Sequence, residues 1–239
     1  LSLVGSEMCI RDRDEVTIAK VLQQNGYATG CVGKWHLGAF SPYLPTDHGF
    51  DTYFGIPYSN DMSRKEQIKL GNTKYPYEYI IYEQEKELER EPQQYNLTQQ
   101  VTKAAIRYIK SNENSPFFLY LAHPMPHMPV YASTDFQGKS ARGKYGDTVE
   151  ELDWSVGQIL QTLKSEGLDK NTLVIFTSDN GPWLLCKQEG GSPGPLKDGK
   201  ASMFEGGFRV PCIMWGAMVK PGYITAVSYT HLTLPTNRE

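Results

Sequence analysis

The chain has 239 residues and a formal net charge of −3. This length suffices to bury a substantial core, as one large α/β domain or two small ones. Because the chain has no excess of basic residues, it is a poor candidate for binding nucleic acid or an anionic membrane. No apolar run approaches the roughly 18 residues that span a bilayer, and the N-terminus lacks the charged-then-apolar order of a signal peptide.

The first predicted elements are a helix and a short strand. Residues 14–26 begin with acidic side chains and end at Gly26, a common helix stop. Apolar residues recur in this range at helical spacing, at Val16, Ile18, Ala19 and Leu22. A strand is expected to follow, roughly from Tyr27 to Val32.

The same alternation of helices and strands recurs downstream. The sequence predicts helices over 98–112 and 147–167, and apolar strands over 116–122 and 171–178. Strands that alternate with helices favour an α/β fold with a mostly parallel sheet flanked by helices on both faces.

Two further segments and both ends follow other patterns. Residues 75–94 favour a β-ribbon with a solvated, charged connection, and the Gly- and Pro-rich residues 188–211 favour an irregular loop. Residues 1–13 and 226–239 do not continue the hydrophobic periodicity of the neighbouring predicted elements, so we interpret them as non-native tips. The segment 14–225 has no internal repeat or domain linker and is expected to form one domain.

The cysteines and a glycosylation motif carry little functional signal. Cys9, Cys31, Cys186 and Cys212 are scattered without a CxxC pair, which argues against a zinc ribbon or a dense disulfide framework. We interpret them as small, buried apolar side chains. Asn96 begins an N-glycosylation acceptor, which would matter only in a secretory compartment.

A lysine and a histidine flank a tryptophan just after the first predicted strand. Lys34 and His36 lie between Gly33 and Gly38, and both side chains are costly to bury unpaired. If the chain is extended here, they point to one face and Trp35 to the other. Lysine can donate to an anion and histidine can move a proton near neutral pH, so a functional pair is favoured over an exposed loop.

Polar residues also follow the two later apolar strands. His123 and His127 lie in the proline-rich loop after residues 116–122, where they could act as a base, bind a metal or cap carbonyl groups. Asp179 and Asn180 follow the last strand. They offer hard oxygen ligands for Ca²⁺ or Mg²⁺, although Asp-Asn-Gly is also an ordinary turn sequence.

The last cluster lies in the glycine-rich loop. Lys200 follows Gly199, and this segment could let the backbone approach an anion. Glu205 and Arg209 are interpreted as a bidentate structural pair. Two lysines, two or three histidines and an Asp-Asn pair suit the hydrolysis of an anionic ester, provided that they line one cavity.

Five segments in order resemble the sulfatase family, in particular its arylsulfatase A and N-acetylgalactosamine-6-sulfatase group. They read GYATGCVGKWHLG, LPTDHGFDTYFGIPYSNDM, PFFLYLAHPMPHMP, NTLVIFTSDNGPW and GKASMFEGGFRVP. The resemblance implies an alkaline-phosphatase-like α/β fold and hydrolysis of sulfate esters by a formylglycine that a formylglycine-generating enzyme makes from cysteine or serine. It also implies a divalent ion, Ca²⁺ or Mg²⁺, held by Asp179 and Asn180.

The resemblance assigns further roles by motif. Lys34 would bind the sulfate, and His36 would contact the formylglycine hydrate and assist its breakdown. Ser59 would bond near the sulfate, and His127 would protonate the leaving alcohol. Lys200 would clamp the sulfate and the leaving oxygen. His48 is interpreted as a structural residue or one that supports a ligand.

The sequence also departs from the family pattern. The C/S-x-P-S-R motif and the two metal-binding aspartates expected upstream do not occur in these residues, and Cys9 is not assigned as the nucleophile. The chain is therefore expected to be an incomplete catalytic domain with little or no sulfatase activity. By family, its parent is expected to be lysosomal, secreted or periplasmic.

Three alternatives remain. A phosphatase or phosphodiesterase of the same superfamily would need more Asp and His ligands than the sequence offers. A non-catalytic protein that binds sulfated glycans would keep the pocket without the nucleophile. A dinucleotide-binding domain is disfavoured, because no GxGxxG follows a predicted strand.

Overall fold

The computed structural model describes residues 15–74, 78–222 and 224. The chain divides into two compact units, Leu1–Glu166 and Gly167–Glu239. The two expected tips, 1–13 and 226–239, lie outside the described residues, so their assignment stays a prediction. In the part of the chain that the structure describes, no helix is both long and apolar enough to cross a membrane.

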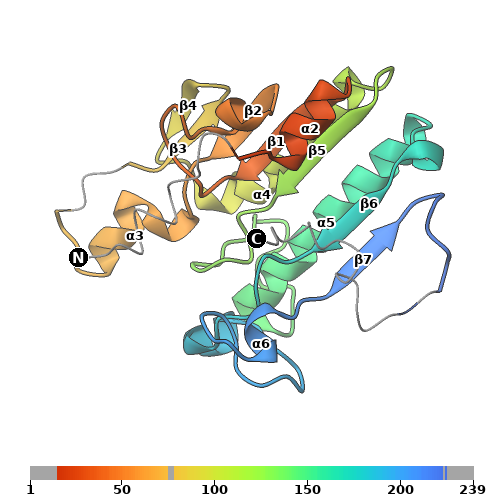
Figure 1. Cartoon of the computed structure of the whole chain (residues 1–239). Coiled ribbons are helices and arrows are strands. Elements are labelled where there is room, and N and C mark those ends of the chain that lie inside the picture. The colour runs from red at the N-terminus through yellow and green to blue at the C-terminus, as the bar shows by residue number, and fades with distance from the viewer. Residues whose placement is uncertain (1–14, 75–77, 223, 225–239) are drawn as a thin grey trace, which may run out of the picture. The chain divides into compact units, whose positions relative to one another are not determined.

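The first unit is built on a five-stranded mixed sheet with the strand order β4-β3-β2-β1-β5 (Figure 1). β1 pairs in parallel with β2 and with β5, while β2–β3 and β3–β4 are antiparallel. The ribbon expected within residues 75–94 is formed by β3 and β4, and it adds antiparallel strands to the parallel strands β2, β1 and β5. The strands are β1 Ala28–Lys34, β2 Thr52–Ile56, β3 Ile80–Glu83, β4 Lys86–Arg90 and β5 Phe117–Ala122.

Helices cover both faces of this sheet, as the sequence predicts. Ala19 packs in the same apolar cluster as Cys31 of β1, whereas the ring of Tyr108 lies over the neighbouring Gly30. Successive strand residues face opposite ways, so the helices that carry Ala19 and Tyr108 lie on opposite faces. The helices of this unit are α2 Ile18–Gln24, α3 Arg64–Lys69, α4 Leu97–Ser111 and α5 Gly143–Ser165.

Several predicted boundaries are wrong by a few residues. Helix α2 begins only at Ile18, because the Thr17 hydroxyl caps it by accepting a hydrogen bond from the Lys20 N–H at 3.0 Å. Val16 therefore lies outside the helix, and it is exposed. Strand β1 continues to Lys34, whose partner in the parallel register is Ile56 of β2.

The second unit contains a small antiparallel sheet. Strands β6 Val174–Thr177 and β7 Cys212–Trp215 pair with each other, and a one-turn helix, α6 Glu205–Phe208, precedes β7. The segment 188–211 is otherwise mostly irregular, as expected. Strands β2 and β7 and helix α3 were not predicted, because their short sequences show neither a strict alternation nor a helical period.

The cysteines only partly match the interpretation as buried apolar side chains. Cys31 is fully buried in the core, and burial raises the pKa of its thiol. Cys186 is half-buried and Cys212 is exposed, so the interpretation is wrong for Cys212. The physical reason is its place in β7, whose residues are mostly exposed.

Candidate functional site

The end of β1 carries the lysine–histidine pair. Lys34 is the last residue of the strand, and the next side chain, Trp35, is buried and donates from Nε1 to the carbonyl oxygen of Tyr43 at 2.8 Å. His36 is exposed and has a φ of 65°. The expectation of a fully extended Lys34-Trp35-His36 is therefore wrong at His36, where the backbone enters the left-handed region and turns the chain.

The two flanking glycines are required by the backbone. Gly33 has a φ of 112°, and a Cβ there would overlap the carbonyl oxygen of Ala122 on β5. Gly38 has a φ of 144°, and its Cβ would overlap the side chain of Tyr43. These glycines let β1 pack closely against its neighbours and then turn, which fixes where Lys34 and His36 lie.

The loop after β1 is held against the loop after β2. The N–H of Trp35 donates to the carbonyl oxygen of Ile56 at 3.0 Å, and the N–H of His36 donates to that of Pro57 at 2.9 Å. Ser59 follows two residues later and is buried. The carboxyl ends of parallel strands are the usual place for ligands in such sheets, and here they bring the segments of Lys34, His36 and Ser59 together.

His127 reaches the same place from the loop after β5. Its Nδ1 lies 3.1 Å from Ser59 Oγ, 2.7 Å from the carbonyl oxygen of Met128 and 3.9 Å from Asp61 Oδ1. A carbonyl oxygen only accepts hydrogen bonds, so Nδ1 carries the hydrogen. Nε2 is then the ring nitrogen that is left to exchange a proton with a ligand.

A buried amide network fixes the loop of His127 to that of Ser59. Asn60 is fully buried, and its Nδ2 donates to the carbonyl oxygen of Pro129 at 2.8 Å and to Gln94 Oε1 at 3.2 Å. Gln94 Nε2 donates back to the Asn60 carbonyl oxygen at 3.1 Å. Sequence reasoning missed Asn60, Asp61 and Gln94. Recognition of β2 would have drawn attention to the first two, which follow its carboxyl end.

His123 and His48 lie apart from this group of contacts. His123 Nε2 lies 3.2 Å from Ser155 Oγ, its Nδ1 is shielded from solvent, and burial lowers its pKa to about 4. His123 is thus neutral near pH 7 and unsuited to donate a proton there. His48 is buried, with its ring centroid 5.9 Å from that of Trp35, which agrees with a structural role.

The depressed pKa of His123 predicts acid-sensitive stability. The unfolded chain takes up this proton near the ordinary pKa of 6.5, whereas the folded chain does so only near 4. The free energy of unfolding should therefore fall by roughly 3 kcal/mol as pH drops through this window. His123→Gln should remove most of this dependence, as measured by urea unfolding at several pH values. His36→Gln, at an exposed histidine, is the control, and an unchanged slope in His123→Gln would contradict the assignment.

In the second unit, the Asp-Asn pair and Lys200 occupy neighbouring loops. Asp179 is exposed and Asn180 half-buried, in a bend directly after β6. Two residues later, the carbonyl oxygen of Pro182 accepts a hydrogen bond from the Lys200 N–H at 2.8 Å. The Lys200 ammonium lies 5.1 Å from the centre of the Trp183 ring, a favourable cation–π distance.

The Glu205–Arg209 pair is present but differs from the prediction. Arg209 Nη1 donates to Glu205 Oε2 at 3.1 Å, and both side chains are about half exposed. The structure thus shows a single contact instead of a bidentate pair, and Arg209 lies just after helix α6 in extended backbone. An exposed pair of this kind contributes at most about 1 kcal/mol to stability.

The sequence predicts Asp179 and Asn180 as ligands of a divalent ion. Asp179 and Asn180 supply adjacent carboxylate and amide oxygens, the hard donors that Ca²⁺ and Mg²⁺ prefer. Among the described residues, no three His, Cys, Asp or Glu side chains are grouped to hold a metal. The pair fits such an ion in donor type, but supplies fewer than the ~6 oxygens that Ca²⁺ takes.

The seven predicted site residues thus form two groups. Lys34, His36, Ser59 and His127 lie on three mutually contacting segments of the first unit. Asp179, Asn180 and Lys200 lie on two contacting loops of the second unit. Convergence of both groups on one cavity stays a prediction.

The fold and these loops define an alkaline-phosphatase-like α/β protein. A structure of the PsFucS1 sulfatase from Pseudoalteromonas sp. superimposes with a TM-score of 0.76 at 27% identity, covering 85% of this chain and 45% of that one. A structure of Ps i-CgsB in complex with k-i-k-neocarrahexaose superimposes with a TM-score of 0.70 at 33% identity, covering 86% and 48%. The mixed sheet with flanking helices is thus part of a larger fold in these proteins.

The chain belongs to the sulfatase family, whose model matches residues 6–236. It is 43% identical over 223 residues to N-acetylgalactosamine-6-sulfatase of Mus musculus, covering 91% of this chain and 42% of the relative. It is 36% identical over 240 residues to arylsulfatase A of Bos taurus, covering 93% and 47%. The chain therefore spans less than half the length of these relatives.

Proposed function

We propose that the protein represented by this chain hydrolyses sulfate esters. The single observation that carries the proposal is the Ser59–His127 contact at 3.1 Å beside the carboxyl ends of β1 and β2. This contact joins two segments that resemble the sulfatase pattern, in a chain that belongs to the family.

His127 acts as the general acid in this proposal. Its Nδ1 is anchored on the Met128 carbonyl oxygen at 2.7 Å, which directs the titrating Nε2 away from that anchor. The protonated ring donates from Nε2 to the oxygen of the leaving alcohol, which would otherwise depart as a costly alkoxide. The contact of Ser59 Oγ with Nδ1 at 3.1 Å helps to hold the ring in one orientation, and the Asp61 carboxylate lies 3.9 Å from the same nitrogen.

Two lysines and a second histidine complete the proposed roles. Lys34 and Lys200 bind the negatively charged sulfate group, since an ammonium group donates to anionic oxygens. His36, one residue past the buried Trp35, moves a proton during release of the sulfate.

The remaining chemistry requires groups beyond these side chains. A formylglycine, made by a formylglycine-generating enzyme from a cysteine or serine in a C/S-x-P-S-R segment, would supply the nucleophile. A Ca²⁺ or Mg²⁺ ion held partly by Asp179 and Asn180 would neutralise charge on the sulfate. The substrate would be a sulfated small molecule or glycan, and an extracytoplasmic compartment is proposed from the family.

Restoring the upstream region tests the proposal. The 239-residue chain is expected to show little or no turnover of an aryl sulfate, because the C/S-x-P-S-R motif does not occur in its sequence. A longer version with that region from the parent gene, produced with the formylglycine-generating enzyme, should hydrolyse 4-nitrophenyl sulfate. An otherwise identical version with alanine at the C/S position is the control.

Two outcomes would contradict the proposal. Robust turnover by the 239-residue chain would show that the missing motif is not needed. Turnover of 4-nitrophenyl phosphate in preference to the sulfate by the longer version would favour a phosphatase of the same superfamily.

A further inference from the structure

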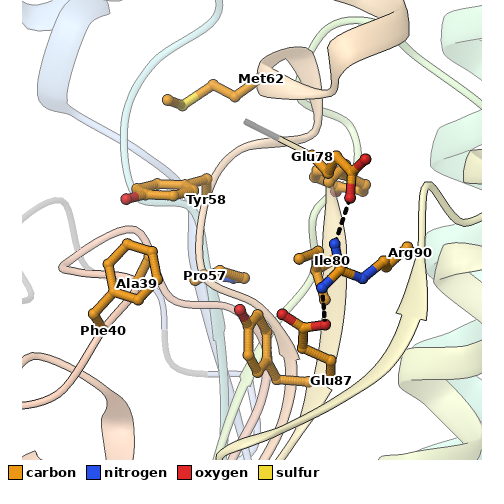
Figure 2. Close-up of a pocket in the computed structure, with 11 residues that line it drawn as sticks. Ala39, Phe40, Pro57, Tyr58, Met62, Glu78, Ile80, Glu87 and Arg90 are labelled. Atoms are coloured by element: carbon orange, nitrogen blue, oxygen red, sulfur yellow. Dashed lines mark hydrogen bonds and ion pairs between the residues drawn. The ribbon is translucent and has the colours of Figure 1, made fainter. Parts of the chain in front are cut away.

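A pocket of about 340 Å³ lies beside the loops that follow β1 and β2 (Figure 2). Its walls come from those two loops and from the β3–β4 ribbon. This volume is at the low end of the roughly 300–1,000 Å³ of small-molecule sites, so it suits a ligand of one or two rings. None of the roles proposed above uses the pocket.

The pocket adjoins the residues proposed to react. Pro57 and Tyr58 line it and directly precede Ser59, and the Pro57 carbonyl oxygen accepts the hydrogen bond from His36. Met62 also lines it and directly follows Asp61, the carboxylate near His127. The segments that carry Ser59 and Asp61 therefore also form part of the pocket wall.

The two sides of the pocket differ in chemistry. Figure 2 shows Phe40 and Tyr58 on one side, and Glu78, Arg90 and Glu87 on the other. The Phe40 side chain is 65% exposed, so its ring face is accessible to a ligand. An aromatic face opposite polar groups suits a ring that is apolar on one face and polar at its edge.

The polar side is a charged triad. Arg90 Nη1 lies 2.6 Å from Glu78 Oε2, and Arg90 Nη2 pairs with Glu87. The three side chains remain between about one-third and three-fifths exposed, so a ligand can reach them. The triad offers both donors and acceptors and carries a net charge of −1. A neutral hydroxyl can use either kind of group, whereas an anion must compete with two carboxylates for one guanidinium.

We propose that this pocket binds a neutral sugar ring of the substrate and disfavours an acidic one. The ring stacks on Phe40 and Tyr58, and its hydroxyls bond to the Glu78–Arg90–Glu87 triad. A plain aryl group would use the aromatic side alone. The inference rests on the proposed function only in treating this sugar as part of the leaving alcohol, because sugar binding itself requires no sulfate chemistry.

Sugar binding by the 239-residue chain tests the inference directly. Methyl β-galactoside, which carries no sulfate, should shift the NMR signals of Phe40, Tyr58 and Met62 on titration. The matching methyl galacturonoside, which differs by a carboxylate, should bind at least about tenfold more weakly. Equal or tighter binding of the uronate, or no shift at these residues with the galactoside, would overturn the proposal.

Point variants locate the binding. Arg90→Ala and Phe40→Ala should each weaken galactoside binding by about tenfold, and both side chains are exposed enough for the fold to survive. Leu88→Ala is the matched control, because Leu88 is an exposed residue of β4 outside the pocket. If both pocket variants bind like the control, the proposal fails. Sulfate turnover by the longer protein is measured separately, so either proposal can fail alone.

Discussion

His127→Gln, in a protein that carries the upstream motif, is expected to lower turnover of a sugar sulfate by about 10²- to 10⁴-fold, the usual contribution of a general acid. A sugar alkoxide is a poor leaving group, so its departure depends on the proton from His127 Nε2. Glutamine can replace the contact with the Met128 carbonyl oxygen but cannot supply that proton. Steady-state kinetics on the sugar sulfate measure the loss.

The leaving group distinguishes proton donation from binding. With 4-nitrophenyl sulfate, the phenolate departs without protonation, so His127→Gln should retain most of its turnover. Lys103→Gln, on the exposed side of α4, controls for effects of the substitution itself. An equal loss of turnover on both substrates would show that His127 binds the sulfate or supports the loop and does not act as the acid.

The sequence predicts the parallel core well, because its elements carry strong local signals. Residues 98–112 and 147–167 have long amphipathic periods, and residues 116–122 form an apolar run, so α4 and β5 lie close to the predicted ranges, while α5 overlaps its range but begins earlier, at Gly143. Strand β2 reads as Thr-Tyr-Phe-Gly-Ile within a polar and glycine-containing stretch. Its strand state depends on pairing with β1 and β3, which are distant in sequence.

The difference between local sequence signals and contacts that are distant in sequence also separates the predicted site residues from the missed ones. The sequence predicts His127 as a reactive residue type in a rigid loop, and the family resemblance predicts Ser59. Asn60 and Gln94 act through buried amide contacts that join segments 34 residues apart, and no local pattern reports such contacts. The turn at His36 was also missed, since a positive φ at a non-glycine residue is uncommon.

Trp35→Ala is expected to destabilise the first unit by about 3 to 5 kcal/mol, the usual cost of removing a buried tryptophan. The side chain is only 7% exposed and packs in a cluster with Cys31 and Phe50. Its ring meets that of Phe50 edge-on at 5.9 Å, and its Nε1 donates to the Tyr43 carbonyl oxygen. Native domains are stable by only about 5 to 15 kcal/mol, so this loss is a large fraction.

Hydrogen exchange of the β1 and β2 amides as a function of urea measures this loss locally, which matters because the chain has two compact units. Leu70→Ala, at an exposed leucine of the same unit, should change the free energy of unfolding by less than about 0.5 kcal/mol. If Trp35→Ala lowers the free energy of unfolding by less than about 1 kcal/mol, the tryptophan does not stabilise this region as expected. Trp35→Phe should cost less, because it keeps an aromatic ring and loses mainly the bond to Tyr43. Lys34 and His36 flank Trp35, so the packing of this buried side chain also positions the two neighbouring residues that are proposed to act on the sulfate ester.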